Sequence, residues 1–167
     1  MQRIRFPLLM LSIAIVLSGE YALAQGLKLT GVGGRIGYFD PEQLSGTVGF
    51  GGHLSFTTGQ VKLLPTVEYW GKSKNNVDFS QWSFAVDARY HYSSESFNPF
   101  VGLGLGVLNT DGGVGDSSTD FGLDLLGGVE LPVSEKLAIT GELKYVVTEL
   151  HTVRISAGLT YLLGKTK

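Results

Sequence analysis

The sequence contains no cysteine among its 167 residues, and only 17% of them are charged. A chain without cysteine can form neither a disulfide framework nor a thiolate metal site. The formal net charge is −2, and no basic patch is present that would indicate nucleic-acid binding. After residue 24, no apolar run approaches the about 20 residues of a membrane-spanning helix. If this part of the chain enters a membrane, it must do so as a closed β-barrel, which leaves no backbone polar group unpaired in lipid.

The first 24 residues have the pattern of a secretory signal peptide. Arg3 and Arg5 precede an apolar run over 6–18, and Ala22-Leu23-Ala24 has the form of an A-x-A cleavage site. The run is shorter than a spanning helix, which argues against an N-terminal membrane anchor. We predict a signal peptide over 1–24 and a single domain over 25–167. No cysteine follows the cleavage site, so a lipoprotein is excluded.

The segment 98–108 gives the clearest structural signal in the chain. Over 101–107, Val and Leu residues alternate with Gly102, Gly104 and Gly106. A period of two is typical of a β-strand, because successive side chains leave opposite faces. Glycines weaken a free-standing strand, but they suit a wall whose glycine face lines a narrow, crowded interior and whose apolar face contacts lipid. The segment therefore predicts a small membrane barrel.

Eight segments with this alternation predict eight antiparallel strands, each about 9–13 residues long, as tilted membrane strands require. They are 28–39, 46–57, 61–71, 81–92, 98–108, 119–131, 136–147 and 152–163. Longer connections at 40–46, 72–80 and 109–119 alternate with short ones at 58–60, 93–96 and 132–135, as expected for outer loops and periplasmic turns. Pro65 lies inside the third segment and predicts a bulge or a local break, because proline cannot donate to the ladder.

The apolar faces of these strands indicate which side contacts lipid. A soluble barrel would place them inside, but those of the last five strands carry no charge, and a charge facing the centre of the bilayer costs about 2–4 kcal/mol. They also end in aromatic residues, which favours two belts at the membrane interfaces. The predicted belts are Tyr69, Trp82, Phe121 and Tyr145 near the outer ends, and Tyr90, Tyr92, Phe100 and Tyr161 near the inner ends.

Three segments resemble the small eight-stranded outer-membrane barrels of the OmpA/OmpX type, within the broad porin-like outer membrane β-barrel family. They are 98–106, the turn over 130–137 and the closing segment 158–163. The resemblance covers 25–167 and implies an all-β up-and-down transmembrane barrel in the bacterial outer membrane, in contact with outer-membrane lipid. One departure concerns assembly: such proteins usually end on an aromatic residue, whereas this chain ends Gly164-Lys165-Thr166-Lys167. Tyr161 and Leu163 are the candidates for the assembly signal.

Nine charges are predicted to face the barrel interior: Arg35, Glu68, Asp87, Arg89, Asp124, Glu130, Glu142, Lys144 and Arg154. Buried charges persist only when they are paired, and an eight-stranded barrel is just wide enough for side chains to fill. We expect an ion-pair network that plugs the interior. A second hypothesis, which the resemblance allows, is that some pairs exchange partners and open a narrow water path. The candidate gate for this path consists of ion pairs between the acids Glu68, Asp124 and Glu142 and the bases Arg89, Lys144 and Arg154.

The segment His91-Tyr92-Ser93 is similar to the His-x-Ser of outer-membrane lipid A deacylases. A catalytic hydroxyl needs a base and an acid to orient it. Glu95 is too near in sequence to match that family's later acid, Leu105 stands about where that acid would be, and the segment lies at the predicted periplasmic end. His53 and His151 are isolated, so no zinc site is indicated. We expect no enzyme, no cofactor and no metal.

The sequence thus predicts a monomeric integral outer-membrane barrel with a structural or surface-interaction role and an unidentified surface ligand. The short loops argue against a strong adhesin, since loops on a rigid scaffold usually carry binding. The alternative is a narrow porin-like channel for small solutes or ions, which needs a continuous wet path. A more remote alternative is a lipid-modifying outer-membrane enzyme, which needs an acid, a base and a nucleophile at one rim.

Overall fold

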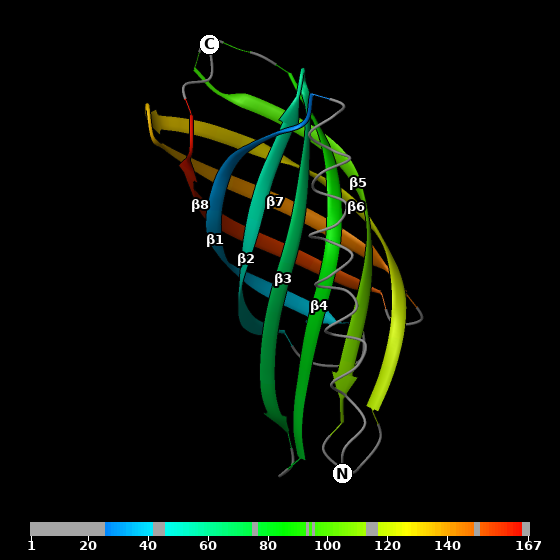
Figure 1. Cartoon of the computed structure of the whole chain (residues 1–167). Coiled ribbons are helices and arrows are strands. Elements are labelled where there is room, and N and C mark those ends of the chain that lie inside the picture. The colour runs from blue at the N-terminus through cyan, green and yellow to red at the C-terminus, as the bar shows by residue number, and fades with distance from the viewer. Residues whose placement is uncertain are drawn as a thin grey trace.

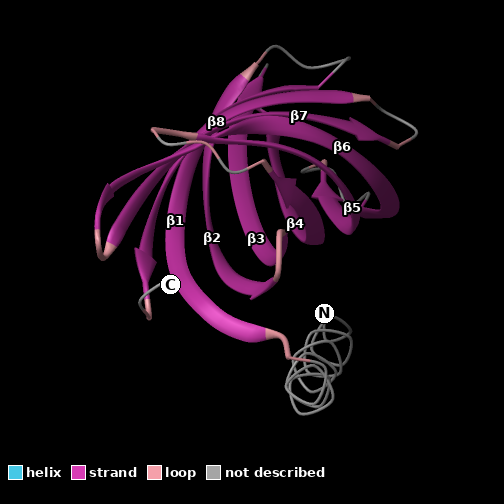
Figure 2. Ribbon diagram, turned by 90° about the horizontal axis from the view of Figure 1, so that it is seen from above, coloured by secondary structure: helices cyan, strands magenta, loops and turns pink. Residues whose placement is uncertain are grey.

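The computed structural model describes residues 26–41, 46–74, 77–92, 94, 96–112, 117–148 and 151–164; the predicted signal peptide lies outside them. Eight strands follow one another along the chain: β1 (Lys28–Pro41), β2 (Thr47–Thr58), β3 (Val61–Lys74), β4 (Val77–His91), β5 (Asn98–Asp111), β6 (Ser117–Ser134), β7 (Leu137–Val147) and β8 (Thr152–Leu162). They close into one barrel in this order, with every neighbouring pair antiparallel (Figures 1 and 2). None of the described residues belongs to a helix long and apolar enough to cross a membrane.

The register of the strands fixes how they tilt. Following the register once around the barrel from Gly31, and carrying it across the break between β2 and β3, leads back to β1 at Pro41, ten residues further along. This offset is the shear of the barrel, and it requires the strands to lean against the barrel axis. It also decides which inward side chains from distant strands reach the same height.

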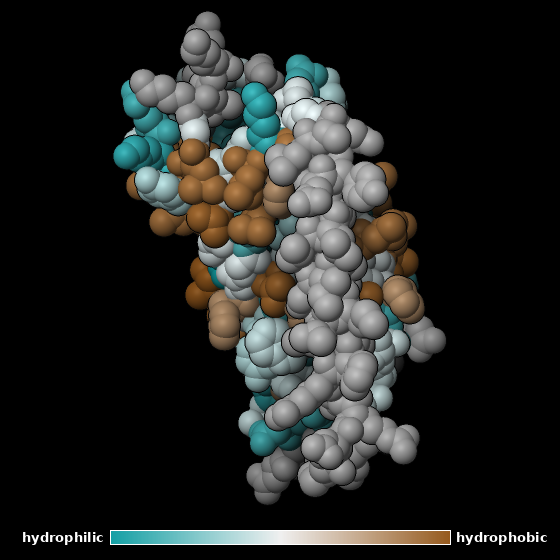
Figure 3. Space-filling view, in the orientation of Figure 1, coloured by the Kyte–Doolittle hydropathy of each residue, from teal (hydrophilic) through white to brown (hydrophobic). Residues whose placement is uncertain are grey.

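Alternation along each strand separates a lipid-facing surface from a packed interior. Outward residues such as Leu105 and Phe121 are exposed, whereas inward residues such as Asp87 are fully buried. Figure 3 shows the result on one face, where apolar residues form a band between polar ends. A band of this kind is what the hydrocarbon region of a bilayer requires.

Inward glycines leave space for larger neighbours. A Cβ added to Gly104 would lie 2.3 Å from Asp87 Oδ1, and one added to Gly128 would lie 2.7 Å from the ring of Phe100. The glycine face of β5 therefore lines the crowded side of the wall, as the sequence predicts.

Two predicted loops are wrong, because the hairpins extend further than the alternation indicates. In place of a loop over 72–80, Lys72 pairs with Phe79 and Ser73 with Asp78, which leaves 75–76 to connect β3 and β4. In place of a loop over 109–119, Asp111 pairs with Ser117. Most of these residues are polar because they lie beyond the apolar band, so period two no longer appears as a sustained hydrophobic pattern. Strand β6 likewise continues to Ser134, through the predicted turn at 132–135.

The extended hairpins mark one end of the barrel. In Figure 1 the lower ends of β3–β6 project beyond the ends of β1 and β7. The connections at 42–46, 75–76, 112–116 and 148–151 lie at this end. We assign it to the extracellular side, where outer-membrane barrels carry their longer projections, and the opposite end to the periplasm.

Pro65 produces a local break. The pairing of β3 with β2 runs from Phe56↔Leu63 to His53↔Thr66 and skips Leu64 and Pro65 between them, and the register is the same on both sides. On its other side Pro65 stays opposite Val86 of β4. The missing N–H of proline thus interrupts one ladder, and no bulge forms.

Candidate functional site

The candidate site is the charged interior of the barrel. All nine charges selected from the sequence lie there, with residue exposures between 0% and 9%. A tenth, Lys62, faces the same interior and is equally buried. Among the described residues the interior therefore holds five basic and five acidic side chains, so its formal charge is zero.

Eight of these side chains form one connected chain in which the sign of the charge alternates. In order, its members are Arg154, Glu68, Arg35, Glu142, Arg89, Asp87, Lys144 and Asp124. We call this set the ion-pair chain. The candidate gate residues fall into three of its contacts, which join Arg154 to Glu68, Arg89 to Glu142, and Lys144 to Asp124.

The middle of the ion-pair chain depends on Glu142. One carboxylate oxygen lies 3.2 Å from Arg35 Nη1, and the other lies 2.5 Å from Arg89 Nη2. Arg35 also lies 3.6 Å from Glu68, whose second oxygen accepts a hydrogen bond of 2.6 Å from Arg154. Each of these three arginines thus contacts at least one carboxylate on a strand that is not adjacent to its own.

Lys144 forms the most compact part of the ion-pair chain. Its ammonium donates to both oxygens of Asp87, at 2.9 and 2.7 Å, and to Asp124 at 3.0 Å. Gly104 lies between these two acids, because a Cβ there would meet Asp87 at 2.3 Å and Asp124 at 3.1 Å. The position therefore carries glycine because the carboxylates occupy the space of a side chain.

Lys62 and Glu130 form a separate pair near the periplasmic end. The ammonium of Lys62 donates to both carboxylate oxygens of Glu130 at 2.7 Å. The sequence analysis selects Glu130 and omits Lys62. The signal was present, since Lys62 has the same strand parity as the inward Glu68.

Phe100 belongs to the interior, which corrects its assignment to an aromatic belt. It is 2% exposed. The guanidinium of Arg89 lies 4.7 Å from the centre of its ring, and His91 stacks on it at 5.1 Å. Its parity along β5 is that of Gly102 and Gly104, so alternation places it inside even though aromatic rings are common at membrane interfaces.

Residues 9–161 match the family model of the outer membrane protein beta-barrel domain. The chain belongs to this family. No curated protein matches it by sequence.

Solved structures of small outer-membrane barrels share the fold. Neisserial surface protein A (NspA) superposes with a TM-score of 0.69 at 18% identity, covering 81% of this chain and 98% of NspA. Ail, the attachment invasion locus protein of Yersinia pestis, was solved with the heparin analogue sucrose octasulfate; its TM-score is 0.55 at 13% identity, over 81% of this chain and 97% of Ail. The outer membrane enzyme PagL gives 0.50 at 14% identity, over 77% and 97%. The protein is therefore an outer-membrane β-barrel.

The remaining aromatic residues of the predicted belts lie outside the interior. Near the extracellular end Tyr69 contacts Trp82, with ring centres 4.7 Å apart, and near the periplasmic end Tyr90 meets Tyr92 edge to face at 5.0 Å. Phe121 is 82% exposed. The other two, Tyr145 and Tyr161, are exposed as well. Rings in these positions suit the two interfaces of the outer membrane.

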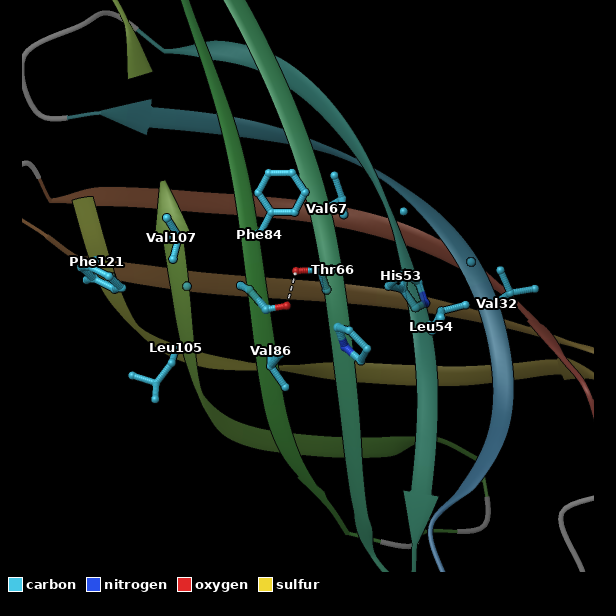
Figure 4. A pocket seen from close by; sticks show the side chains of 16 residues that line it. Val32, His53, Leu54, Thr66, Val67, Phe84, Val86, Leu105, Val107 and Phe121 are labelled. Carbon is cyan, nitrogen blue, oxygen red and sulfur yellow. Dashed lines mark hydrogen bonds between the residues drawn. The ribbon is translucent and has the colours of Figure 1, made fainter. Parts of the chain in front are cut away.

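The wall of the barrel also carries an apolar groove across β1–β6. Figure 4 labels its outward side chains, which include Val32, Leu54, Val67, Phe84, Val86, Leu105, Val107 and Phe121. The hydroxyl of Thr66 donates to the backbone oxygen of Ala85 at 3.4 Å. A lipid-facing wall has this composition, so the groove fits acyl chains better than a polar ligand.

The segment 91–93, which is similar to a deacylase motif, shows no catalytic arrangement among the described residues. Ser93 lies outside the described residues. The ring of His91 stacks on Phe100, and its Nε2 has no hydrogen-bond partner in the part of the chain that the structure describes. No group of three or more metal-ligating side chains occurs in that part either.

Proposed function

We propose that the protein is a closed, non-catalytic outer-membrane barrel that acts through contacts at the cell surface. The observation that carries this proposal is the uneven extracellular end. The pairing of β6 with β7 stops at Leu123↔Val147, whereas β6 begins at Ser117. Among the described residues, 117–122 therefore have a strand partner on the β5 side alone.

A strand edge without a partner strand in the described part of the chain suits an extended peptide. Its row of N–H and C=O groups can add one more strand to a sheet, and alternate side chains then set specificity. The neighbouring ladders of β3–β4, β4–β5 and β5–β6 support this edge down to Ser80↔Asp111 and Asp111↔Ser117. The contact surface would thus stand on a rigid sheet.

The charge of this end favours a basic or neutral partner. The described side chains there include Asp40, Asp78, Asp111 and Asp120, against Lys72. The ammonium of Lys72 donates to the backbone oxygen of Gly46 at 3.1 Å. A surplus of acidic side chains repels polyanions. We therefore do not propose that this chain binds a heparin analogue such as the one in the Ail complex.

A binding measurement tests the surface role. The probe is a fluorescent peptide in which lysine alternates with valine, presented to the refolded protein in nanodiscs. Successive N–H groups point to opposite sides of a strand. Of the two variants Ser118→Pro and Thr119→Pro, one therefore removes an N–H that points away from β5, and we call it the edge variant. The other removes an N–H that points toward β5. We expect the edge variant to lose peptide binding while keeping its unfolding midpoint.

Two controls make this measurement specific. Ser94→Pro, at the periplasmic end, should bind the peptide like the unaltered protein. A peptide of the same composition with proline at alternate positions should not bind, because it cannot form a ladder. Equal binding by all variants, or by the proline peptide, would overturn the surface role at β6.

Single-channel conductance in a planar bilayer tests closure. Because the interior charges are buried and interlocked, we expect no current from protein shown to be inserted. Discrete, voltage-stable steps that change in Glu68→Ala or Arg154→Ala would instead support the narrow channel, with the ion-pair chain as its gate.

A further inference from the structure

An apolar layer crosses the lumen between the ion-pair chain and the extracellular end. It consists of Phe39, Trp70, Leu108 and Val146, which are 1–4% exposed. These residues come from β1, β3, β5 and β7, the four strands that run toward the extracellular side. Trp70 follows Glu68, and Val146 follows Lys144, at the next inward position on the same strand. The layer therefore lies immediately outside the charges.

The layer is tightly packed where the intervening strands β2 and β6 carry glycine. A Cβ on Gly49 of β2 would lie 2.7 Å from the Phe39 ring and 2.8 Å from Trp70 Cβ. A Cβ on Gly122 of β6 would lie 2.9 Å from Leu108 Cδ1 and 3.2 Å from Val146 Cγ1. The apolar side chains thus fill the space over both glycines.

The region beneath this layer suits water. Nδ1 of His53, Nε of Arg89, and Nε and Nη2 of Arg154 are buried, with no hydrogen-bond partner among the described residues. A cavity of about 10 Å³ is bounded in part by Arg35, His53, Arg89 and Glu142. That volume is about the size of one water molecule, and buried polar groups without a protein partner are the usual ligands of internal water.

We propose that the ion-pair chain occupies a water-holding compartment, and that the layer of Phe39, Trp70, Leu108 and Val146 seals this compartment from the extracellular side. The indole N–H of Trp70 donates to Gln81 Oε1 at 3.0 Å, and the other three side chains offer water no hydrogen bond. A narrow apolar constriction of this kind stays dry. Ion pairs, in contrast, attract water when they open. The barrier to ions is therefore the apolar layer, and it exists whether or not the extracellular edge of β6 binds a partner.

Single thiols on the two sides of the layer test the proposal. The chain has no cysteine, so each variant carries one reactive group. Ser83 lies inside the compartment, with its Oγ 3.4 Å from Glu68 and 3.5 Å from Arg154. Thr110 lies beyond Leu108 on β5, where it accepts a hydrogen bond of 2.9 Å from Gln81. In lipid vesicles that carry the protein with its extracellular end outward, and with Ag⁺ added outside, we expect Ag⁺ to react with Ser83→Cys at least about tenfold more slowly than with Thr110→Cys.

Making the layer polar should remove this protection. Leu108→Asn with Val146→Thr keeps the number and branching of the side-chain heavy atoms, and we expect it to accelerate the reaction at Ser83→Cys about tenfold or more. The reaction at Thr110→Cys should not change. The matched control is Leu64→Asn, a buried position in the periplasmic half, which should leave Ser83→Cys protected. Val146→Thr alone gives the same readout if the double variant does not fold.

Three results would overturn the proposal. The first is equal reactivity of Ser83→Cys and Thr110→Cys in the otherwise unaltered protein. The second is a protected thiol in the Leu108→Asn, Val146→Thr background together with a reactive thiol after Glu68→Gln, which would make the ion pairs the barrier. The third is equal exposure of the thiol by Leu64→Asn, which would give the extracellular layer no special role.

Discussion

The interior contains two groups of ion pairs that use the same residue types in different surroundings. In the ion-pair chain every member except the two at its ends contacts two partners, and side-chain exposures are 0–5%. Lys62 and Glu130 contact each other, and both side chains are 11% exposed. Burial removes the alternative of water, so a charge in the ion-pair chain depends on all of its neighbours. The pair near the periplasmic end can replace a lost partner with solvent.

Removing Lys144 should have the largest effect. Lys144→Met leaves Asp87 and Asp124 facing each other without their shared cation, and we expect a loss of about 3–5 kcal/mol in unfolding free energy. Reversible urea unfolding in lipid vesicles, followed by the fluorescence of Trp70 and Trp82, measures this loss. Adding Asp124→Asn should restore part of it, because Asp87 keeps Arg89 at 4.0 Å and the acid that loses its ion-pair partner is then neutral. An unchanged urea midpoint would contradict the proposed dependence.

Removing Arg154 should cost less, because it stands at the end of the ion-pair chain. Arg154→Ala leaves Glu68 with Arg35 at 3.6 Å as a remaining partner. We expect a loss of about 2–3 kcal/mol, as for a buried charged group that loses one of its bonds. The same urea titration applies. A loss equal to that of Lys144→Met would show that the position in the chain makes no difference.

Filling the space beside Asp87 tests packing without removing a charge. Gly104→Ala introduces a Cβ 2.3 Å from Asp87 Oδ1. The carboxylate must shift, and we expect a loss of about 1–3 kcal/mol, which is typical of overpacking. Gly141→Ala is the matched control, since a Cβ there meets nothing within 4 Å. Equal urea midpoints for the two variants would show that the pairs around Lys144 tolerate displacement.

The Lys62–Glu130 pair should give the smallest effect. For Lys62→Met we expect a loss of about 1 kcal/mol, because a partly exposed carboxylate regains water. The loss should shrink as salt is raised in the urea titration, unlike that of Lys144→Met. Exchanging the two residues, by Lys62→Glu with Glu130→Lys, should restore the stability. A salt-independent loss as large as that of Arg154→Ala would erase the contrast between the two groups.

The faces of the strands were predictable because lipid imposes a strict alternation. One polar residue in the wrong register would face the hydrocarbon, so Val101, Leu103 and Leu105 identify the outer face from sequence alone. Phe100 was misassigned because its residue type was given more weight than its parity. The length of the β3–β4 and β5–β6 hairpins escaped prediction because most residues of a strand outside the membrane are polar and leave no sustained apolar alternation.

The ion pairs themselves could not be assigned from sequence. Which inward charges meet depends on the shear of the barrel, a property of all eight ladders together. Arg35 reaches Glu142 of β7 because the strands lean by the offset between Gly31 and Pro41. The alternation along each single strand thus predicts which charges face the interior, whereas the pairing of these charges depends on the closed barrel.

The same contacts bear on how the protein folds. Arg35 and Glu142 are 107 residues apart in the chain, Glu68 and Arg154 are 86 apart, and Asp87 and Lys144 are 57 apart. A partly assembled sheet without β8 would hold Glu68 in the membrane without Arg154, and unpaired charge is costly there. Intermediate sheets are therefore penalised until β1 meets β8. Insertion and closure then become a single cooperative event, driven by the neutralisation of the lumen.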